Sequence, residues 1–312
     1  MTDHEGNFAQ FPAGDSANEP CALATSPLHP FATVRPIGLL AGSGRLPILF
    51  AEKARQMGLS VVCVGIRYEA SPILREIVHR FYWVGVSRLG GMIRSFKREG
   101  VERIVMAGKI TKAVMYTPWR ILRLCPDWRG AKFWLRNARR DNRDDTLTLA
   151  FIDEFRRDGM DFDSALNLCP ELLAQPGTLT KRQPSAKEQA DIEFGWHLAK
   201  EMGRLDVGQS VAVKERAVLA VEAIEGTDRN ILRAGELCPA GGFTVVKVAK
   251  PQQDMRFDVP TVGPTTIQNL GKAGGKVLAI EANKTIIIDR DETVALANKN
   301  GIAIVALNRE AA

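Results

Sequence analysis

The order of apolar runs, glycine turns and helical patterns constrains the fold of this chain more than any other feature. An apolar run at Pro36–Ala41 is followed by Gly42-Ser43-Gly44 and then by a helical pattern over Arg45–Met57. A second apolar run, Val61–Ile66, is rich in Val and has the length of a buried strand. A strand, glycine turn, helix and strand in succession predict an α/β fold with a Rossmann-like beginning.

The glycine turn has two interpretations. Glycines here can bring backbone N–H groups close to a phosphate at the helix N-terminus, so Gly42 and Gly44 are candidate substrate-binding residues. A dinucleotide site is disfavoured, because Pro47 stands at the third glycine position of that fingerprint and Arg67, not an acid, follows the second strand. The alternative is that the glycines only form a tight turn from strand to helix.

Length and the change of pattern along the chain predict two domains. The 312 residues are enough for two hydrophobic cores. Residues 1–35 are rich in Pro, Ser, Ala and Gly and lack periodicity, so we expect a flexible extension. Residues 36–174 are predicted to form the Rossmann-like domain, 175–184 a linker rich in turn-forming residues, and 185–312 a separate C-terminal α/β domain.

The second domain is predicted to begin with a helix and to continue as an alternation of strands and helices. Ser185 and Glu188 have the spacing of a capping box, and the helix that they start is expected to end at Gly203. The strands are expected near Ser210–Val213, Ala217–Ala223, Phe243–Val248, Val277–Ile280, Thr285–Ile288 and Ile302–Leu307, and the later helices near Asp228–Leu237, Thr265–Ala273 and Asp291–Asn300.

Composition limits the classes of protein and partner. The formal net charge of +6 suits an anionic partner, such as a phosphorylated ligand, a nucleic acid or an acidic membrane surface. The 5 cysteines are scattered and form no CxxC pair, which argues against a disulfide scaffold or zinc site and favours a reduced, cytoplasmic protein. No segment has the ~20 consecutive apolar residues of a membrane span.

Acidic residues gather directly after one of the expected strands. Ala217–Ala223 has the apolar pattern of a strand, and Glu222, Glu225 and Asp228 lie around Gly226. Carboxylates at the C-terminal end of a strand can bind a hard cation such as Mg²⁺. The alternative is a helix N-terminus, where acidic residues favour the helix dipole and cap backbone N–H groups.

A basic, tryptophan-rich stretch at Trp119–Arg143 lies in the first domain. Only Asp127 and Asp141 oppose its many arginines and lysines. The stretch is consistent with a surface for an anionic bilayer or for nucleic acid, and equally with a solvated basic helix whose tryptophans lie in the core. The following Asp144-Asp145-Thr146 predicts a helix cap, and Asp145 can also bind a cation or a sugar.

Six motifs, taken in order, resemble the UDP-2,3-diacylglucosamine pyrophosphatase family of lipid A biosynthesis in its two-domain α/β form. Each motif is short, but the ordered set covers nearly everything from Pro36 onward. The motifs are Gly-Leu-Leu-Ala-Gly-Ser-Gly-Arg-Leu-Pro (38–47), Ala-Gly-Lys (107–109), Asp-Asp-Thr-Leu (144–147), Asp-Val-Gly-Gln-Ser-Val (206–211), Leu-Ala-Val-Glu-Ala-Ile-Glu-Gly-Thr-Asp (219–228) and Lys-Pro-Gln-Gln-Asp-Met-Arg-Phe-Asp-Val-Pro-Thr-Val-Gly (250–263).

The resemblance implies a Mg²⁺-dependent hydrolase that converts a nucleotide-linked glycolipid to UMP and 2,3-diacylglucosamine 1-phosphate. The essential acid of the family falls on Asp228. The resemblance further implies a cytoplasmic protein at the inner-membrane surface, with no nucleic-acid partner, and it allows a homodimer. The extension of residues 1–35 departs from the family, as does Lys109, where the family often has a neutral residue.

These expectations assign a role to each candidate site residue. Asp228 can anchor the cation or accept the proton of the attacking water. Basic side chains can offset phosphate charge, and hydroxyl or amide groups can bind phosphate or uridine. The predicted substrate-binding residues are Gly42, Gly44, Lys109, Asp145, Gln209, Thr227, Lys247, Lys250 and Arg256, and the predicted metal ligands are Asp228, Glu225, Asp254 and Asp258.

Two alternatives from other classes remain at this point. One is a Rossmann-type nucleotide-dependent oxidoreductase, which nicotinamide binding would reveal. The other is a non-enzymatic binder of membrane or nucleic acid through Trp119–Arg143, which would show no catalytic requirement for a metal.

Overall fold

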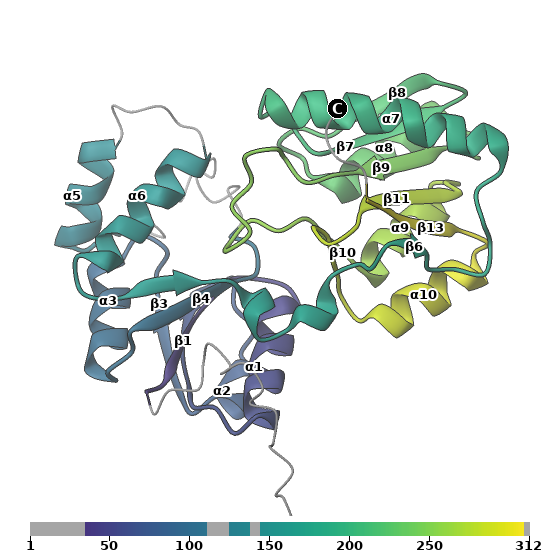
Figure 1. Cartoon of the computed structure of the whole chain (residues 1–312). Helices are drawn as coiled ribbons and strands as arrows, with labels where there is room; N and C mark the ends of the chain where they lie inside the picture. Colours follow the sequence, from purple (N-terminus) through teal and green to yellow (C-terminus); the bar gives the residue numbers. More distant parts are fainter. Residues whose placement is uncertain (1–34, 111–124, 138–143, 309–312) are drawn as a thin grey trace, which may run out of the picture. The chain divides into compact units, whose positions relative to one another are not determined.

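The computed structural model of the chain describes residues 35–110, 125–137 and 144–308. The predicted extension of residues 1–35 therefore lies almost entirely outside the described residues. The described part contains two larger sheets, each with its own helices and core, and a small pair formed by two short strands (Figure 1).

The first sheet has five parallel strands in the order β3-β2-β1-β4-β5. The strands are β1 (Ile37–Ala41), β2 (Val61–Ile66), β3 (Arg80–Val84), β4 (Arg103–Ala107) and β5 (Asp161–Asp163). This order reverses direction between β1 and β4, which is the topology of a doubly wound sheet. The Rossmann-like α/β fold that the sequence predicted for this part of the chain is therefore confirmed.

Helices connect and cover the first sheet. They are α1 (Leu46–Gln56), α2 (Leu74–Ile77), α3 (Leu89–Arg98), α5 (Trp128–Asn137) and α6 (Asp144–Arg156). One face of the sheet packs its alternate apolar side chains against Phe96 of α3 and Phe155 of α6, both fully buried. Strands buried on both faces explain why β1 and β2 appear in the sequence as continuous apolar runs.

The second sheet has six strands in the order β6-β13-β11-β9-β7-β8. Its strands are β6 (Gly177–Thr178), β7 (Ser210–Lys214), β8 (Ala217–Val221), β9 (Thr244–Lys247), β11 (Val277–Glu281) and β13 (Ala303–Leu307). The neighbours β9, β11 and β13 are parallel, whereas β7 is antiparallel to both β8 and β9. Strands β8, β9 and β11 therefore run in the same direction and end at the same edge.

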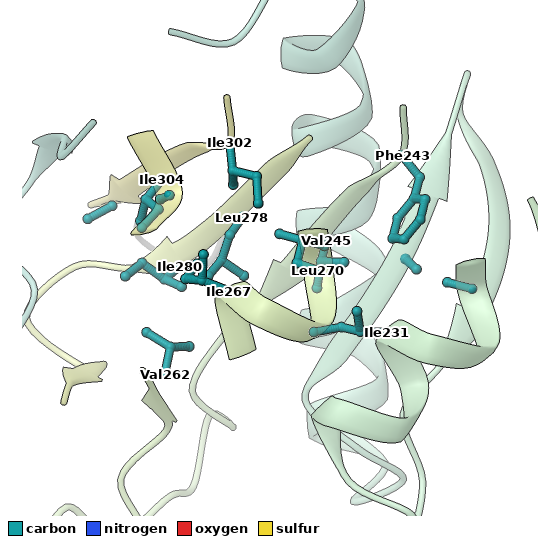
Figure 2. Close-up of a cluster of buried hydrophobic side chains, with 14 of the residues drawn as sticks. Ile231, Phe243, Val245, Val262, Ile267, Leu270, Leu278, Ile280, Ile302 and Ile304 are labelled. Atoms are coloured by element: carbon teal, nitrogen blue, oxygen red, sulfur yellow. The ribbon is translucent and has the colours of Figure 1, made fainter. Parts of the chain in front are cut away.

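Helices cover both faces of the second sheet. One face packs against α7 (Ala186–Arg204) through Trp196 and its neighbours. The other face packs against α8 (Thr227–Leu237), α9 (Pro264–Lys272) and α10 (Arg290–Lys299). Figure 2 shows this second cluster, in which Leu278 and Ile280 of β11 lie near Ile267 of α9.

Three details of the second domain differ from the sequence prediction. The stretch of residues 175–184, predicted as a linker, contains β6, which pairs antiparallel with β13 and so belongs to the sheet. Helix α7 begins with the predicted capping box of Ser185 and Glu188 but continues past Gly203 to Arg204. The short strand β10 (Thr261–Val262) was not predicted; it pairs with β12 (Ile286–Ile287).

Candidate functional site

The candidate site lies at the edge where β8, β9 and β11 end. Glu222 follows β8, and Lys247 is the last residue of β9. Side chains alternate between the faces of a sheet, and Ala220 and Val245, two residues earlier on each strand, lie on the face covered by α8. Glu222 and Lys247 therefore point to the same face, toward the start of α8.

Asp228 lies in the first turn of α8, beside Glu222. Gly226 precedes the helix at its N-cap position, with a φ of 81° that glycine adopts readily, and no side chain caps the helix N-terminus. Thr227 Oγ1 donates to the Glu222 carboxylate and lies 3.2 Å from each of its oxygens. Asp228 is therefore not a capping residue, although its position still suits the helix dipole.

Lys247 is the one strongly buried cation that the described residues bring to this edge. The residue is 4% exposed, and Nζ donates to the backbone carbonyl of Thr261 at 2.8 Å. Burial lowers the pKa of the Lys247 ammonium below its ordinary value, because a charged form is costly away from water. The negative charges of Glu222, Asp228 and Asp258 act against that effect.

Two buried acceptor atoms at this edge have neither a hydrogen bond nor an ion pair within the described part of the chain. They are Oδ1 of Asp228 and Oε1 of Gln209, the residue before β7. Both residues line a pocket together with Glu222 and Lys247. Buried acceptors without a donor are costly, so these atoms are available to bind water, a ligand or a cation.

Other predicted site residues are held by protein partners. Arg256 donates to both carboxylate oxygens of Asp254, at 3.0 Å to Oδ1 and at 2.6 Å to Oδ2. Lys250 Nζ donates to Asp206 at 2.5 Å. Glu225 lies 2.7 Å from Arg233.

The carboxylates at this edge suit Mg²⁺ only when a bound ligand supplies part of its coordination. Among the residues that the structure describes, no three Asp, Glu, His or Cys side chains come together as a metal-binding group. Mg²⁺ commonly keeps several waters and binds one or two carboxylates together with substrate phosphates. Asp228, whose Oδ1 has no partner in the described part of the chain, meets that requirement, and Asp258 is another carboxylate whose charge acts on Lys247.

The predicted substrate-binding residues of the first domain make different contacts. The N–H of Gly42 donates to Ala107 O, and Ser43 and Lys109 exchange two backbone hydrogen bonds of 2.7 and 2.9 Å. These N–H groups are therefore not available to a phosphate. Gly44 has a φ of 99° and open space around its Cα. Asp145 lies in the first turn of α6, and its side chain is outside the described residues.

The structure adds residues that the sequence analysis missed. Glu281 ends β11 at the same edge and is 2% exposed, and it binds Lys200 of α7 at 2.6 Å. Asp206, the partner of Lys250, has a positive φ of 58°. A charged residue at the end of an otherwise apolar strand, as in Val277–Glu281, was a signal that could have identified Glu281.

The fold and site define an α/β protein with a doubly wound first domain and a second domain that gathers an acid and a buried lysine at one sheet edge. The LpxI N-terminal domain family matches residues 36–172, and the LpxI C-terminal domain family matches residues 175–305. The UDP-2,3-diacylglucosamine pyrophosphatase LpxI of Caulobacter vibrioides (strain ATCC 19089 / CIP 103742 / CB 15) is 32% identical over 284 residues, which cover 88% of this chain and 98% of that protein. The chain belongs to the LpxI family.

Solved structures resemble the chain only remotely. The GalE-like L-threonine dehydrogenase from Cupriavidus necator is 10% identical, with 88% of this chain and 86% of that chain covered and a TM-score of 0.30. The L-threonine dehydrogenase from Phytophthora infestans is 21% identical over 33% of each chain, with a TM-score of 0.22. These scores are too low to support an argument about function.

Proposed function

We propose that this chain hydrolyses the pyrophosphate of UDP-2,3-diacylglucosamine to 2,3-diacylglucosamine 1-phosphate and UMP in lipid A biosynthesis. Its relative in Caulobacter vibrioides carries the name of that activity. The observation that carries the proposal is the buried Oδ1 of Asp228, which has no partner among the described residues and lies near the buried Lys247 at one sheet edge. A pyrophosphate needs both a base for water and positive charge for its phosphoryl oxygens.

Asp228 acts on the attacking water in this proposal. A carboxylate whose oxygen has no protein donor can accept the proton of a water that attacks phosphorus. Asp228 is also the residue that would hold Mg²⁺, which when bound neutralises phosphate charge and lowers the pKa of its water. Gln209 Oε1 needs a donor, so a hydroxyl or imide N–H of the substrate suits it.

Lys247 stabilises the charge that develops on the phosphoryl oxygens. Its ammonium is held by the carbonyl of Thr261 on one side, so its remaining N–H bonds are oriented before the substrate arrives. A fixed cation away from water interacts strongly with developing charge, because little water has to reorganise.

Incubation with UDP-2,3-diacylglucosamine tests this function. We expect UMP and 2,3-diacylglucosamine 1-phosphate in a 1:1 ratio with Mg²⁺, and loss of turnover with EDTA that added Mg²⁺ restores. Titration of Mg²⁺ in the presence of UMP gives a second readout without turnover, and Asp228→Asn should weaken that binding. Activity that persists in EDTA would overturn the Mg²⁺ requirement, and intact substrate would overturn the function.

We also propose that α5 contacts the surface of an anionic bilayer, where the diacyl substrate resides. Trp128 is 86% exposed and Leu135 is 76% exposed, and Lys132 and Arg136 are exposed on the same face of the helix. Phe133 is buried in the core, and Arg129 is paired with Glu154 and Asp158. Exposed apolar and basic groups on one helical face suit a headgroup region.

This face is part of the Trp119–Arg143 stretch, of which residues 119–124 and 138–143 lie outside the described residues. Within the described part, no helix is long and apolar enough to cross a bilayer. A cytoplasmic location at the inner membrane therefore stays a proposal that rests on this face and on the family's substrate. The homodimer also stays a prediction.

Sedimentation with vesicles tests the membrane proposal. We expect binding to vesicles rich in anionic lipid, weakening as salt rises, because exposed charges are screened. Trp128→Ala with Leu135→Ala should reduce the bound fraction, whereas Leu237→Ala, at a leucine that is 61% exposed on α8, should not. Equal binding to neutral vesicles would contradict the electrostatic part, and no binding to either would contradict the proposal.

A further inference from the structure

A buried ion pair on the opposite face of the second sheet contacts the backbone that leads into the site. Glu281 has a side chain 3% exposed, and Lys200 of α7 has one 12% exposed. Their charged atoms lie 2.6 Å apart. Lys284 approaches the other carboxylate oxygen at 3.0 Å. Charges this deeply buried cost desolvation energy, so a pair retained here calls for an explanation beyond stability.

Both partners of this pair bind the same peptide residue. The backbone N–H of Ala249 donates to Glu281 Oε2 at 2.9 Å. Lys200 Nζ donates to the backbone carbonyl of Ala249 at 3.1 Å. Because Glu281 and Lys200 are bound to each other as well, the three residues form a closed ring of interactions through the backbone N–H and C=O of Ala249. Both the donor and the acceptor of Ala249 are therefore fixed.

Ala249 lies at the point where the chain leaves the sheet for the site. It follows β9 by two residues, and the intervening Val248 donates its N–H to Gln209 O at 3.0 Å. The next residues, 250–258, contain turns and carry four of the predicted site residues, which are Lys250, Asp254, Arg256 and Asp258. The position of Ala249 therefore sets where this loop begins.

Sheet geometry explains why the pair acts on the loop and not on Asp228. Val277 and Ala279 of β11 face α7, so Glu281, two residues further, faces α7 as well. Asp228 lies on the opposite face, in α8, and its position depends on Gly226 and β8. A substitution of Glu281 is therefore expected to affect the loop of residues 250–258 more directly than it affects Asp228.

We infer that the Glu281–Lys200 pair is a positioning element that holds the loop of residues 250–258 in the conformation that binds substrate. This inference rests on the proposed function, because the loop matters only if the edge beside it is the active site. Glu281 and Lys200 touch the Ala249 backbone, so they are positioning residues and not catalytic ones.

The first test separates binding from turnover. In Glu281→Gln, we expect KM for UDP-2,3-diacylglucosamine to rise about tenfold, while kcat changes by less than about threefold, since misplacement of binding groups has effects of this order or more. Hydrogen exchange of the amides of residues 249–258 should accelerate in the same variant without substrate. The exchange rate is measured independently of activity. An inactive wild-type protein would overturn the proposed function, and unchanged exchange of residues 249–258 in Glu281→Gln would overturn the positioning role of the pair.

A matched control comes from another buried carboxylate of the same domain. Asp191 is 4% exposed and accepts the N–H groups of Glu215 and Arg216 at 3.0 and 2.6 Å, in the turn between β7 and β8. Asp191→Asn should lower Tm, as we also expect for Glu281→Gln, but should leave KM and the exchange of residues 249–258 unchanged. An equal rise of KM in both variants would show that lost stability, and not loop position, is responsible.

The double variant Glu281→Gln with Lys200→Met distinguishes the effect of an unpaired buried charge from the effect of lost hydrogen bonds to Ala249. The single change leaves Lys200 buried without its partner, which destabilises the fold, and the second change removes that charge. We expect Tm to recover in the double variant while KM stays raised, because the methionine side chain cannot donate to the Ala249 carbonyl. Recovery of KM together with Tm would overturn the inference, as would an unchanged KM in Glu281→Gln.

Discussion

The carboxyl edges of the two sheets differ in what their polar atoms contact. In the first sheet, the loops after β1 and β4 bind each other through the backbone bridge of Ser43 and Lys109. In the second sheet, Asp228 Oδ1 and Gln209 Oε1 are buried without a partner in the described residues, beside the buried Lys247. Both edges have glycines and polar residues at positions where α/β proteins bind ligands. The difference shows that a ligand site requires polar atoms without protein partners, and a glycine turn alone does not provide them.

The largest expected effect is at the second edge, in Asp228→Asn. The amide keeps the size of the side chain but loses its charge and its ability to accept a proton. We expect near-normal folding and turnover lower by on the order of 10²-fold or more, measured as kcat with UDP-2,3-diacylglucosamine over a range of Mg²⁺ concentrations. Turnover close to that of the wild type would move the essential acid to another residue and remove the contrast between the edges.

Lys247→Met should have the next largest effect. Removing a fixed cation from developing phosphate charge is expected to lower kcat/KM on the order of 10–100-fold. The pH dependence of stability gives a second readout. Because the folded pKa of Lys247 is lowered, the unfolded chain binds more protons than the folded chain between that pKa and the ordinary 10.5. Wild-type stability should therefore rise with pH in this window relative to Lys247→Met.

Urea unfolding of both proteins at neutral pH and at about pH 9 checks this sign. If the difference in stability between the wild type and Lys247→Met stays constant with pH, folding does not shift the pKa of Lys247. If the wild type instead loses stability relative to Lys247→Met as pH rises, folding raises that pKa. Lys247 would then not be the buried cation that distinguishes the edge of the second sheet from the edge of the first sheet.

At the first edge, Gly42→Ala should affect stability more than ligand binding. A Cβ at Gly42 would lie 2.5 Å from the carbonyl oxygen of Lys109, so the bridge must open. We expect a loss of about 1–3 kcal/mol in the free energy of unfolding, with KM nearly unchanged. Gly85→Ala is the control, because a Cβ there meets nothing closer than 3.7 Å. A large rise of KM at unchanged stability would instead make the glycine turn part of the ligand site.

The smallest effect is expected for Asp254→Asn. Its carboxylate is held by Arg256, which keeps the pKa of Asp254 below its ordinary value through their hydrogen bonds. An acid that is already paired is a poor ligand for a cation, so kcat/KM and its Mg²⁺ dependence should change by less than about threefold. A loss as large as that in Asp228→Asn would show that Asp254 exchanges Arg256 for the metal when substrate binds.

The sequence predicted most elements because their local patterns were strong. Val61–Ile66 was predicted with the bounds that the structure has, and the capping box of Ser185 and Glu188 starts α7 as expected. The missed strands β5, β6 and β10 have at most three residues each, and the missed helix α2 has four, too few for a periodicity to appear. The end of α7 was misplaced because Gly203 faces Lys250 at close range, where packing requires a small residue within the helix.

The sequence alone predicted where acidic residues gather but not which of them is available to a ligand. Glu222, Glu225 and Asp228 lie within seven residues, which brings them together in any compact fold, and their spacing pointed to a site after a strand. Which of the predicted metal ligands can bind a cation depends on how side chains pair in the folded chain. Arg233 approaches Glu225 from the next turns of α8, and Arg256 binds Asp254 in its own loop, so neither pairing follows from strand or helix patterns.

The sequence by itself determined the α/β class, the family and the position of Asp228 after a strand, because these depend on residues that are neighbours in the chain or on an ordered set of motifs. Only the tertiary structure decided which polar atoms stay without partners. The parallel ends of β8, β9 and β11 bring Glu222, Lys247 and Glu281 to one edge from positions up to 59 residues apart, as the numbers of Glu222 and Glu281 show. Pairing between strands is a long-range contact, and it therefore fixes the site in a way that no local pattern can.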